Sequence, residues 1–473
     1  MIQDTHPTPR LGRLEFLRRV REDQLSVLSP ELFGQDIVYN RILFLDTFLV
    51  NKPDYIEQVL LTNQRNYRKS DFLRTILGPL LGQGLLISEG EFWRRQRRIA
   101  APAFHTRRVA AFVAAMTACA DATLARWDRM SGPFDIAAEM LGLTLDIVAR
   151  TMFSTDVGGE VASLRRVTDV VVALRPSTLD LLGLPAWIPR LQPAAYRRAI
   201  AEFEALVARF LAERRADGRD RGDLLSMLLA ARDPETGEGM SDKQLRDEII
   251  TILLAGHETV ANALTWTWYL LARHPQAETR LHQELDRVLG GRVPTFADLA
   301  ELEWTGMVID EAMRLYPPAH AISRTAIGED HIGGMLVPAG AAVTINVFVT
   351  HRNPNLWEEP ERFAPERFAP EAAARRHRFS YLPFGGGPRI CIGNGLALVE
   401  AKAILATIAQ RYRVRLVPGH VVEPIGRVTL RARNGVQVTL EPRAGVAKES
   451  RAGAFSGKVE SCFLSENATT QKL

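Results

Sequence analysis

The most informative stretch of this chain is Phe384-Gly385-Gly386-Gly387-Pro388-Arg389-Ile390-Cys391-Ile392-Gly393. Its phenylalanine, third glycine, arginine, cysteine and final glycine follow one another at offsets of three, two, two and two residues. A lone cysteine is most often a small buried apolar residue. The chain has only three cysteines, however, so a cysteine inside so restricted a pattern favours a functional thiol.

The loop around Cys391 has the properties that would present a thiolate to the iron of a flat macrocycle. Its glycines let the backbone turn sharply and approach such a ligand closely. Backbone N–H groups near the sulfur, and the start of a helix predicted over 394–410, stabilise a negative charge there. Phe384 would shield the sulfur side, and Arg389 can pair with a propionate. A thiolate ligand favours cleavage of an O–O bond.

With every signature position matched, the loop resembles the heme-binding signature of the cytochrome P450 family. The resemblance implies a mainly α fold with small β-sheets (α+β) in a single large domain that holds heme b (iron protoporphyrin). It also implies that Cys391 is the axial ligand of the heme iron and that Phe384, Arg389 and Gly393 bind the cofactor. Counting the motifs below, the resemblance covers the chain from residue 37 to residue 443.

A second pattern, Ala255-Gly256-His257-Glu258-Thr259, lies midway along a predicted long apolar helix. Gly256 costs about 1 kcal/mol relative to alanine there, so its small size needs a reason. Thr259 can donate to the carbonyl of Ala255, and the acid–alcohol pair of Glu258 and Thr259 can relay protons. The alternative is a buried helix with incidental polar residues. The pentad resembles the family's oxygen-activation motif, which implies that Thr259 and Glu258 are catalytic and that Ala255 and Gly256 contact the cofactor.

Three residues resemble positions at which the family grips the heme propionates. Trp93 and Arg97 are one helical turn apart and resemble the Trp-x-x-x-Arg pair of the family. Arg324 follows a Pro-Pro helix stop and matches a further propionate-binding position. The resemblance therefore implies that Trp93, Arg97 and Arg324 bind the cofactor together with the loop.

A possible ion-pair triad begins with Glu311 and Arg314, which stand three residues apart on one helix face. On its own this is a surface pair worth a few tenths of a kcal/mol. In the family the pair is buried and joined by a second arginine from a later loop. Two Pro-Glu-Arg-Phe copies occur there, with Arg362 and Arg367, and Arg367 is favoured because its copy is nearer the cysteine loop. The triad is expected to hold the fold rather than to do chemistry.

Arg94, Arg95 and Arg98 surround the Trp93 pair and form a basic cluster. They could form a solvated face, or suggest nucleic acid. In a heme protein, a docking patch for an acidic electron donor is the better interpretation. The net charge of +4 is too small to imply nucleic acid.

The resemblance places substrate contacts in four regions of the chain, around 72–86, 170–191, 319–322 and 428–429, and most of their residues are apolar. The residues expected to line the pocket are Phe72, Leu181, Trp187, Ile322 and Val428. The segment around Leu181 and Trp187 is unusually apolar, and it could be plain core or a lid over an access channel. We expect an apolar substrate, fatty-acid-like or terpenoid.

Length and composition set the organisation. The chain has 473 residues, of which 46% are hydrophobic, so it can bury a large core. We expect an N-terminal extension over 1–35, the heme domain over 36–443 and a disordered tail over 444–473. Few cysteines indicate a reducing cytoplasm. No signal peptide or transmembrane anchor is expected, because the most apolar segment, 249–271, carries a glutamate near its middle and reads as a buried helix.

Periodicity predicts the elements of the domain. The expected helices are 53–61, 93–100, 106–127, 140–153, 161–174, 194–215, 224–231, 244–273, 276–289, 304–315 and 394–410. Strands are expected within 36–50, 337–349 and 428–440.

Taken together, the motifs resemble a soluble bacterial-type heme-thiolate monooxygenase. Such an enzyme inserts one atom of dioxygen into its substrate and reduces the other to water. Its electrons would come from NAD(P)H through a separate acidic ferredoxin or flavodoxin-type donor. A peroxide-driven or isomerase-type enzyme usually alters the Glu258 or Thr259 position, and a non-catalytic heme sensor would not need the pair; both remain alternatives.

Overall fold

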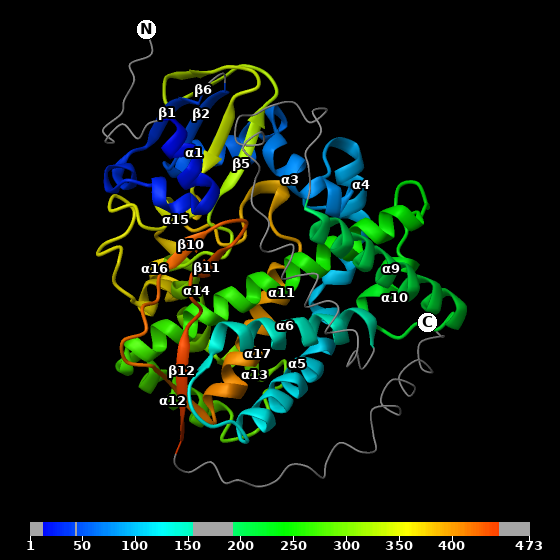
Figure 1. The fold of residues 1–473 in the computed structure, drawn as a ribbon, viewed down its shortest axis with the longest axis vertical. Helices are drawn as coiled ribbons and strands as arrows, with labels where there is room; N and C mark the ends of the chain where they lie inside the picture. Colours follow the sequence, from blue (N-terminus) through cyan, green and yellow to red (C-terminus); the bar gives the residue numbers. More distant parts are fainter. Residues whose placement is uncertain (1–12, 43–44, 155–192, 444–473) are drawn as a thin grey trace.

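A single long helix organises the structure, which is a computed structural model that describes residues 13–42, 45–154 and 193–443 (Figure 1). This helix, α11 (Asp242–Arg273), crosses the middle of the molecule between an end rich in strands and an end rich in helices. Ser241 starts it with a reciprocal capping box that it forms with Gln244.

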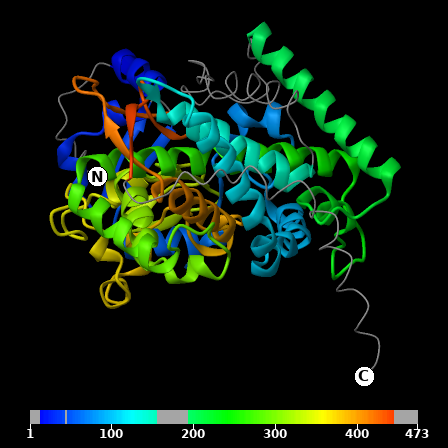
Figure 2. The same cartoon turned by 90° about the horizontal axis from the view of Figure 1, so that it is seen from below.

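Helices make up most of the described chain. The longer ones are α1 (Arg13–Glu22), α3 (Asp71–Leu81), α4 (Gly90–Ala100), α5 (Thr106–Trp127), α6 (Ile136–Phe153), α9 (Ala194–Asp217), α12 (Pro275–Val288), α14 (Glu303–Leu315) and α17 (Asn394–Ala409). The shorter ones are α2 (Pro53–Glu57), α10 (Leu224–Ala230), α13 (Asp298–Glu301), α15 (Val347–Thr350) and α16 (Pro370–Ala374). Seen from below, α9 stands along one edge (Figure 2).

The strands form small sheets. The largest has the order β1-β2-β8-β5-β3, from β1 (Ile37–Ile42), β2 (Leu45–Val50), β8 (Ala342–Ile345), β5 (Ile322–Ala326) and β3 (Tyr67–Lys69). A second has the order β4-β12-β9, from β4 (Phe134–Asp135), β12 (Gln437–Pro442) and β9 (Tyr412–Leu416). Two hairpins join β6 (Asp330–Ile332) to β7 (Met335–Val337) and β10 (Pro424–Gly426) to β11 (Leu430–Ala432).

The main core lies where α5, α6, α11, α14 and α17 meet. Trp266 of α11 is fully buried, and its ring stacks on that of Tyr316 at 3.9 Å between centroids. The C-terminal half of α11 is buried on all sides, so its sequence does not alternate between an apolar and a polar face. The core therefore fixes α11 firmly behind the cavity described below.

The mainly α fold with small sheets is confirmed, and most predicted helices are present within a few residues. The range 337–349, in which a strand was predicted, contains β8, but a turn precedes β8 and α15 follows it. The strand predicted over 428–440 is likewise interrupted between β11 and β12. Helix α3 was not predicted. The helix predicted over 161–174 lies outside the described residues.

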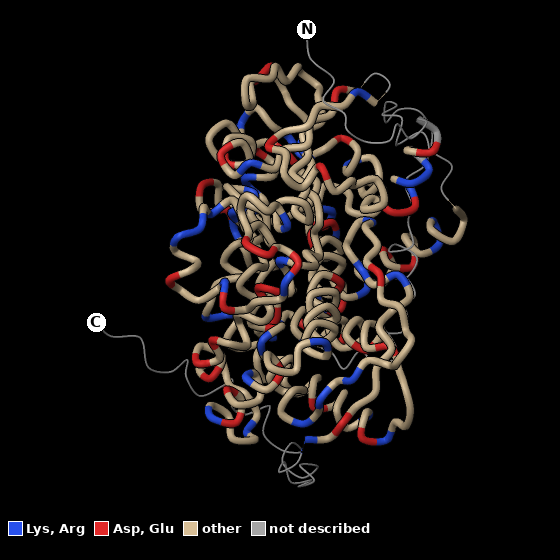
Figure 3. Tube along the Cα trace, turned by 90° about the vertical axis from the view of Figure 1, so that its left-hand side faces the viewer, with Lys and Arg blue, Asp and Glu red and all other residues tan. Residues whose placement is uncertain are grey.

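Among the described residues, one helix is long and apolar enough to cross a membrane, and it is α5 rather than the segment 249–271, which was predicted to be a buried helix. Half of its most apolar window is buried inside the protein, which is also what a core helix shows. Acidic and basic segments are intermixed in the side view (Figure 3).

Candidate active site

A cavity of about 480 Å³ separates the Cys391 loop from α11. Cys391, Phe384 and Gly393 line it from the loop. Ala255, Gly256 and Thr259 line it from α11. The two motifs that the sequence singles out therefore face the same space, although they are more than a hundred residues apart.

The cysteine loop is shaped by its own backbone. The N–H of Cys391 donates to the carbonyl of Phe384 over 2.9 Å and closes the loop. Gly387 has a φ of +66°, and a Cβ there would lie 1.9 Å from the carbonyl oxygen of Leu60. Burial raises the pKa of the Cys391 thiol, while the backbone N–H of Gly393 and the charge of Arg97 act in the opposite direction.

Helix α11 presents Thr259 to the cavity. The Thr259 hydroxyl donates to the carbonyl of Ala255 over 2.8 Å, as predicted, and α11 remains continuous through this turn. A Cβ on Gly256 would meet only Val148, at an ordinary 3.5 Å. Packing of the chain itself therefore does not require glycine at 256.

Glu258 takes a different direction from its neighbour Thr259. It is 9% exposed and is not among the residues that line the cavity. Its Oε1 accepts from Arg431 Nε over 2.8 Å and from the Thr429 hydroxyl, and Arg431 Nη2 forms an ion pair with the same oxygen. The predicted acid–alcohol pair is thus split: its alcohol faces the cavity and its acid faces the β10–β11 hairpin.

Cationic side chains gather at one end of the cavity. Arg97, Arg324 and Arg389 all line it, as does Trp93. Arg389 donates to the carbonyl of Tyr67 over 2.7 Å and to Glu89 over 2.6 Å, and its Nε is buried without a hydrogen-bond partner. Burial lowers the pKa of Arg324 to about 10.

Lys69 is a fourth cation of this group, and sequence reasoning missed it. It is 8% exposed, donates to the carbonyls of Leu85 and Ser88, and lies 5.5 Å from the centre of the Trp93 ring. Burial lowers its pKa to about 7. The available signal was that Lys69 lies in an extended segment just before the predicted pocket residue Phe72.

Comparison with known proteins agrees with this geometry. The family model described as "Cytochrome P450" matches residues 5–439. Cyclooctatin synthase of Streptomyces melanosporofaciens is 41% identical over 412 residues, which cover 86% of this chain and 89% of that protein. The chain belongs to the cytochrome P450 family.

Other relatives point the same way. Cyclooctat-9-en-7-ol 5-monooxygenase of the same organism is 40% identical over 389 residues, covering 81% of this chain and 83% of that protein. Pentalenene oxygenase of Streptomyces avermitilis is 34% identical over 398 residues, covering 84% and 88%. The crystal structure of the cytochrome P450DA heme domain superposes with a TM-score of 0.80 at 28% identity, covering 92% of this chain and 97% of that one. This P450 is a monooxygenase that uses heme and dioxygen.

The residues present fit a heme. The thiol of Cys391 lies on one wall, the small residues Ala255 and Gly256 lie on α11, and the cations include Arg389, whose Nε is buried without a partner. These groups match an iron macrocycle that carries two carboxylates. We therefore assign Cys391 as the residue that would hold the iron, and Arg97, Arg324, Arg389 and Lys69 as those that would hold the carboxylates.

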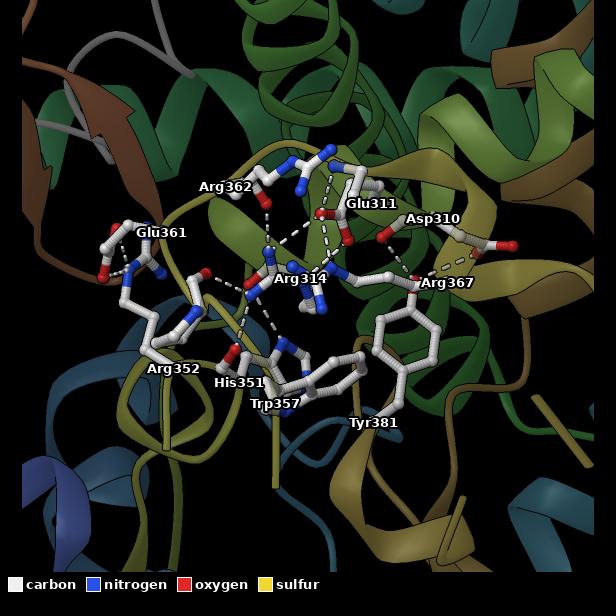
Figure 4. Close-up of polar contacts among 12 residues, drawn as sticks. Asp310, Glu311, Arg314, His351, Arg352, Trp357, Glu361, Arg362, Arg367 and Tyr381 are labelled. Carbon is white, nitrogen blue, oxygen red and sulfur yellow. Dashed lines mark hydrogen bonds and ion pairs between the residues drawn. The ribbon is translucent and has the colours of Figure 1, made fainter. Parts of the chain in front are cut away.

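The ion-pair triad lies beside Tyr381, which precedes Cys391 by ten residues in the chain (Figure 4). Glu311 and Arg314 are fully buried and joined by two hydrogen bonds of 2.7 and 2.8 Å. Arg367 Nε lies 3.5 Å from Glu311, whereas the side chain of Arg362 pairs with the exposed Glu359. Arg367 is therefore the arginine that approaches Glu311.

The triad also fastens the connecting loops. Arg314 donates to the carbonyls of His351, Pro360 and Arg362, and the backbone N–H of Ala364 donates to Glu311. This P450 thus uses one buried pair to satisfy backbone groups of a long irregular segment, which would otherwise be buried without partners.

The basic cluster on α4 differs from expectation. Arg94 pairs with Glu91, whereas Arg95 and Arg98 both pair with Asp233, which is buried. Carboxylates of the same chain pair with these arginines, so they do not form an open basic patch for an acidic electron donor. The sequence could not reveal this because the partner lies more than a hundred residues away.

Three of the predicted pocket residues lie where they were expected. Phe72, Ile322 and Val428 line the cavity. Leu181 and Trp187 lie outside the described residues. His320, which lies in the expected region 319–322 but was not singled out, also lines the cavity, and its Nε2 lies 2.7 Å from the carbonyl oxygen of Arg427.

Proposed function

We propose that this P450 hydroxylates a terpenoid. The single observation that carries the proposal is one cavity with Cys391 and Thr259 on facing walls, cations at one end and an apolar wall elsewhere. The apolar residues Phe72, Leu73, Ile76, Leu77, Ile322 and Val428 line it. The names of the three relatives above refer to cyclic terpenoids or their oxygenation, which supports the terpenoid over the fatty-acid alternative.

The reaction balances with an external source of electrons. A substrate C–H bond and the O–O bond break, one C–O bond forms, and the second oxygen leaves as water; two electrons and two protons are consumed. The heme, when bound, supplies the iron at which dioxygen is reduced and activated. The apolar wall excludes water and orients the C–H bond.

Residues of the chain supply the protons. The Thr259 hydroxyl lies in the cavity and can pass a proton from its Oγ1. Glu258, one residue earlier, is the proposed source that reprotonates it. Lys69, Arg97, Arg324 and Arg389 would hold the cofactor carboxylates and so fix the position of the cofactor in the cavity.

The electron donor is proposed to be an acidic ferredoxin or flavodoxin-type protein that is reduced by NAD(P)H in the cytoplasm. Arg107 and Arg108 are exposed at the start of α5. Phe104, just before them, lies 3.8 Å from the position a Cβ on Gly393 would take, so this basic pair is near the Cys391 loop. Opposite charges would steer the donor to this face.

The test is turnover of the heme-loaded protein with NADPH and a surrogate ferredoxin system. Cyclic terpene hydrocarbons, terpene alcohols, fatty acids and steroids are first screened for a spin-state shift, and those that bind are assayed for hydroxylated product. Product from a terpenoid is the expected result. Product only with hydrogen peroxide would favour the peroxide-driven alternative, and absence of both product and reductant consumption would favour the sensor.

A further inference from the structure

The carboxylate of Glu258 is held by a hairpin that is remote in sequence. The β10–β11 hairpin contributes Thr429 and Arg431, which both bond to Glu258 Oε1. Asn262, one turn further along α11, donates to the Thr429 hydroxyl over 3.3 Å. The hairpin is therefore fastened to α11 at two successive turns, through the proposed proton source Glu258 and through Asn262.

The tip of the same hairpin reaches the cavity. Val428 lines the cavity and is 46% exposed, which is unusual for a large apolar residue of this protein. Val428 and Thr429 lie in the bend before β11, and Arg431 lies within β11. Val428 lines the cavity, whereas the side chains of Thr429 and Arg431 bond to Glu258, which does not. Neighbouring residues of one short segment thus contact the space for substrate and hold the acid.

The hairpin is anchored on its far side by separate contacts. His320 bonds to the carbonyl of Arg427, and the backbone N–H of Gly426 donates to Asp23 over 2.9 Å. Arg433, just after β11, pairs with Asp23 at 2.6 Å. These contacts leave the segment from Val428 to Arg431 as the part whose side chains touch both the cavity and Glu258.

We propose that Thr429 and Arg431 are positioning residues that keep the Glu258 carboxylate outside the cavity until substrate is present. A substrate that presses on Val428 shifts the hairpin strand and loosens the bonds to Glu258, which then reaches the Thr259 hydroxyl. Proton delivery is thereby tied to occupancy, and reductant is spared when the cavity holds only water. The inference rests on the proposed function, because Glu258 must be the proton source.

The first experiment uses the full chain loaded with heme and needs no known substrate. R431Q and T429V are compared with wild type for reductant consumption without substrate, using the surrogate ferredoxin system. We expect each variant to raise this rate by about tenfold, the effect of one lost charge-assisted hydrogen bond. In an E258Q background the same changes should have no effect. Unchanged rates, or equal increases in the E258Q background, would overturn the proposal.

The matched control is R433Q, on the same hairpin. Arg433 pairs with Asp23 and Glu423 rather than with Glu258. R433Q should leave the substrate-free rate at the wild-type value. An increase equal to that of R431Q would mean that any loosening of the hairpin has this effect, and it would overturn a specific role for the bonds to Glu258.

A second readout does not depend on turnover. In denaturant unfolding, the midpoint shifts caused by E258Q and R431Q should be non-additive, whereas those of E258Q and R433Q should add. Additive shifts for the first pair would overturn the contact itself. If R431Q acts through Glu258 but wild type oxidises no terpenoid, the positioning role of Thr429 and Arg431 stands and the assignment of a terpenoid substrate fails. If wild type oxidises a terpenoid and R431Q changes nothing, only the positioning role of Thr429 and Arg431 fails.

Discussion

Lys69 and Arg324 stand directly opposite each other in the antiparallel strands β3 and β5, and both line the cavity. Like charges at such paired positions repel each other. Glu89 offsets part of the repulsion, because it accepts from the backbone N–H of Lys69 and from Arg389. Glu89 leaves part of this positive charge unbalanced, so the arrangement is suited to binding an anionic ligand.

The first prediction concerns this pair. K69M should keep the fold but accelerate loss of heme about tenfold, because one charge-assisted hydrogen bond to a carboxylate is removed. Transfer of heme to apomyoglobin measures the rate. K52M is the control, since Lys52 lies at the surface near Asp36. A K69M protein that retains heme as long as K52M would contradict the assignment of Lys69.

Cys391 can be tested by spectroscopy. C391S should lose the thiolate-type absorption of the ferrous–CO complex, because a hydroxyl cannot donate electron density as a thiolate does. C119S is the matched control: Cys119 is buried in α5 within the main core. If the thiolate-type band survives in C391S, another residue must be the ligand.

T259A should bind heme and substrate normally but divert most reducing equivalents to hydrogen peroxide, lowering the product formed per NADPH by about tenfold or more. The ratio of product to peroxide is the measurement. T265A is matched to it, because Thr265 makes the same bond to the carbonyl four residues back, in the buried part of α11. Equal coupling in T259A and T265A would remove Thr259 from the proton path.

The triad predicts a graded loss of stability. E311Q should lower the free energy of unfolding by about 3–5 kcal/mol, because the fully buried Arg314 is left without its counter-charge. R362Q should cost less than about 1 kcal/mol, since its partner Glu359 is at the surface. R367Q should fall between them. Chemical denaturation gives all three values, and equal costs for R367Q and R362Q would exclude Arg367 from the triad.

Glu400 predicts a pH dependence. It is 2% exposed, its Oε1 has no hydrogen-bond partner, and burial raises its pKa to about 8. The folded protein therefore holds a proton that the unfolded chain releases above about pH 4.5, so Glu400 makes stability fall as the pH rises from about 4.5 to 8. E400Q cannot ionise, and its advantage over wild type should grow by roughly 1 kcal/mol per pH unit in this window. Unfolding at pH 5, 6, 7 and 8 measures it, with E301Q as an exposed control that shows no such growth.

Part of this site could be read from local spacing. The bond from Thr259 to Ala255 follows from helix geometry, because residues four apart meet on one face. The turns at Gly385 and Gly387 likewise follow from residues that tolerate positive φ. The sequence did not show where the strands near residues 340 and 434 begin and end. Apolar residues near 340 belong to a turn, a strand and a short helix, and those near 434 belong to two separate strands.

By itself the sequence determined the chemistry of the two motifs, the mainly α architecture and the class of cofactor, because each depends on residues close together along the chain. Only the tertiary structure decided where the charges go. It paired Glu258 with Arg431 and Arg98 with Asp233, and it placed Lys69 opposite Arg324. Those partners are set by packing of distant elements, and a charged side chain on its own does not reveal which distant partner it will meet.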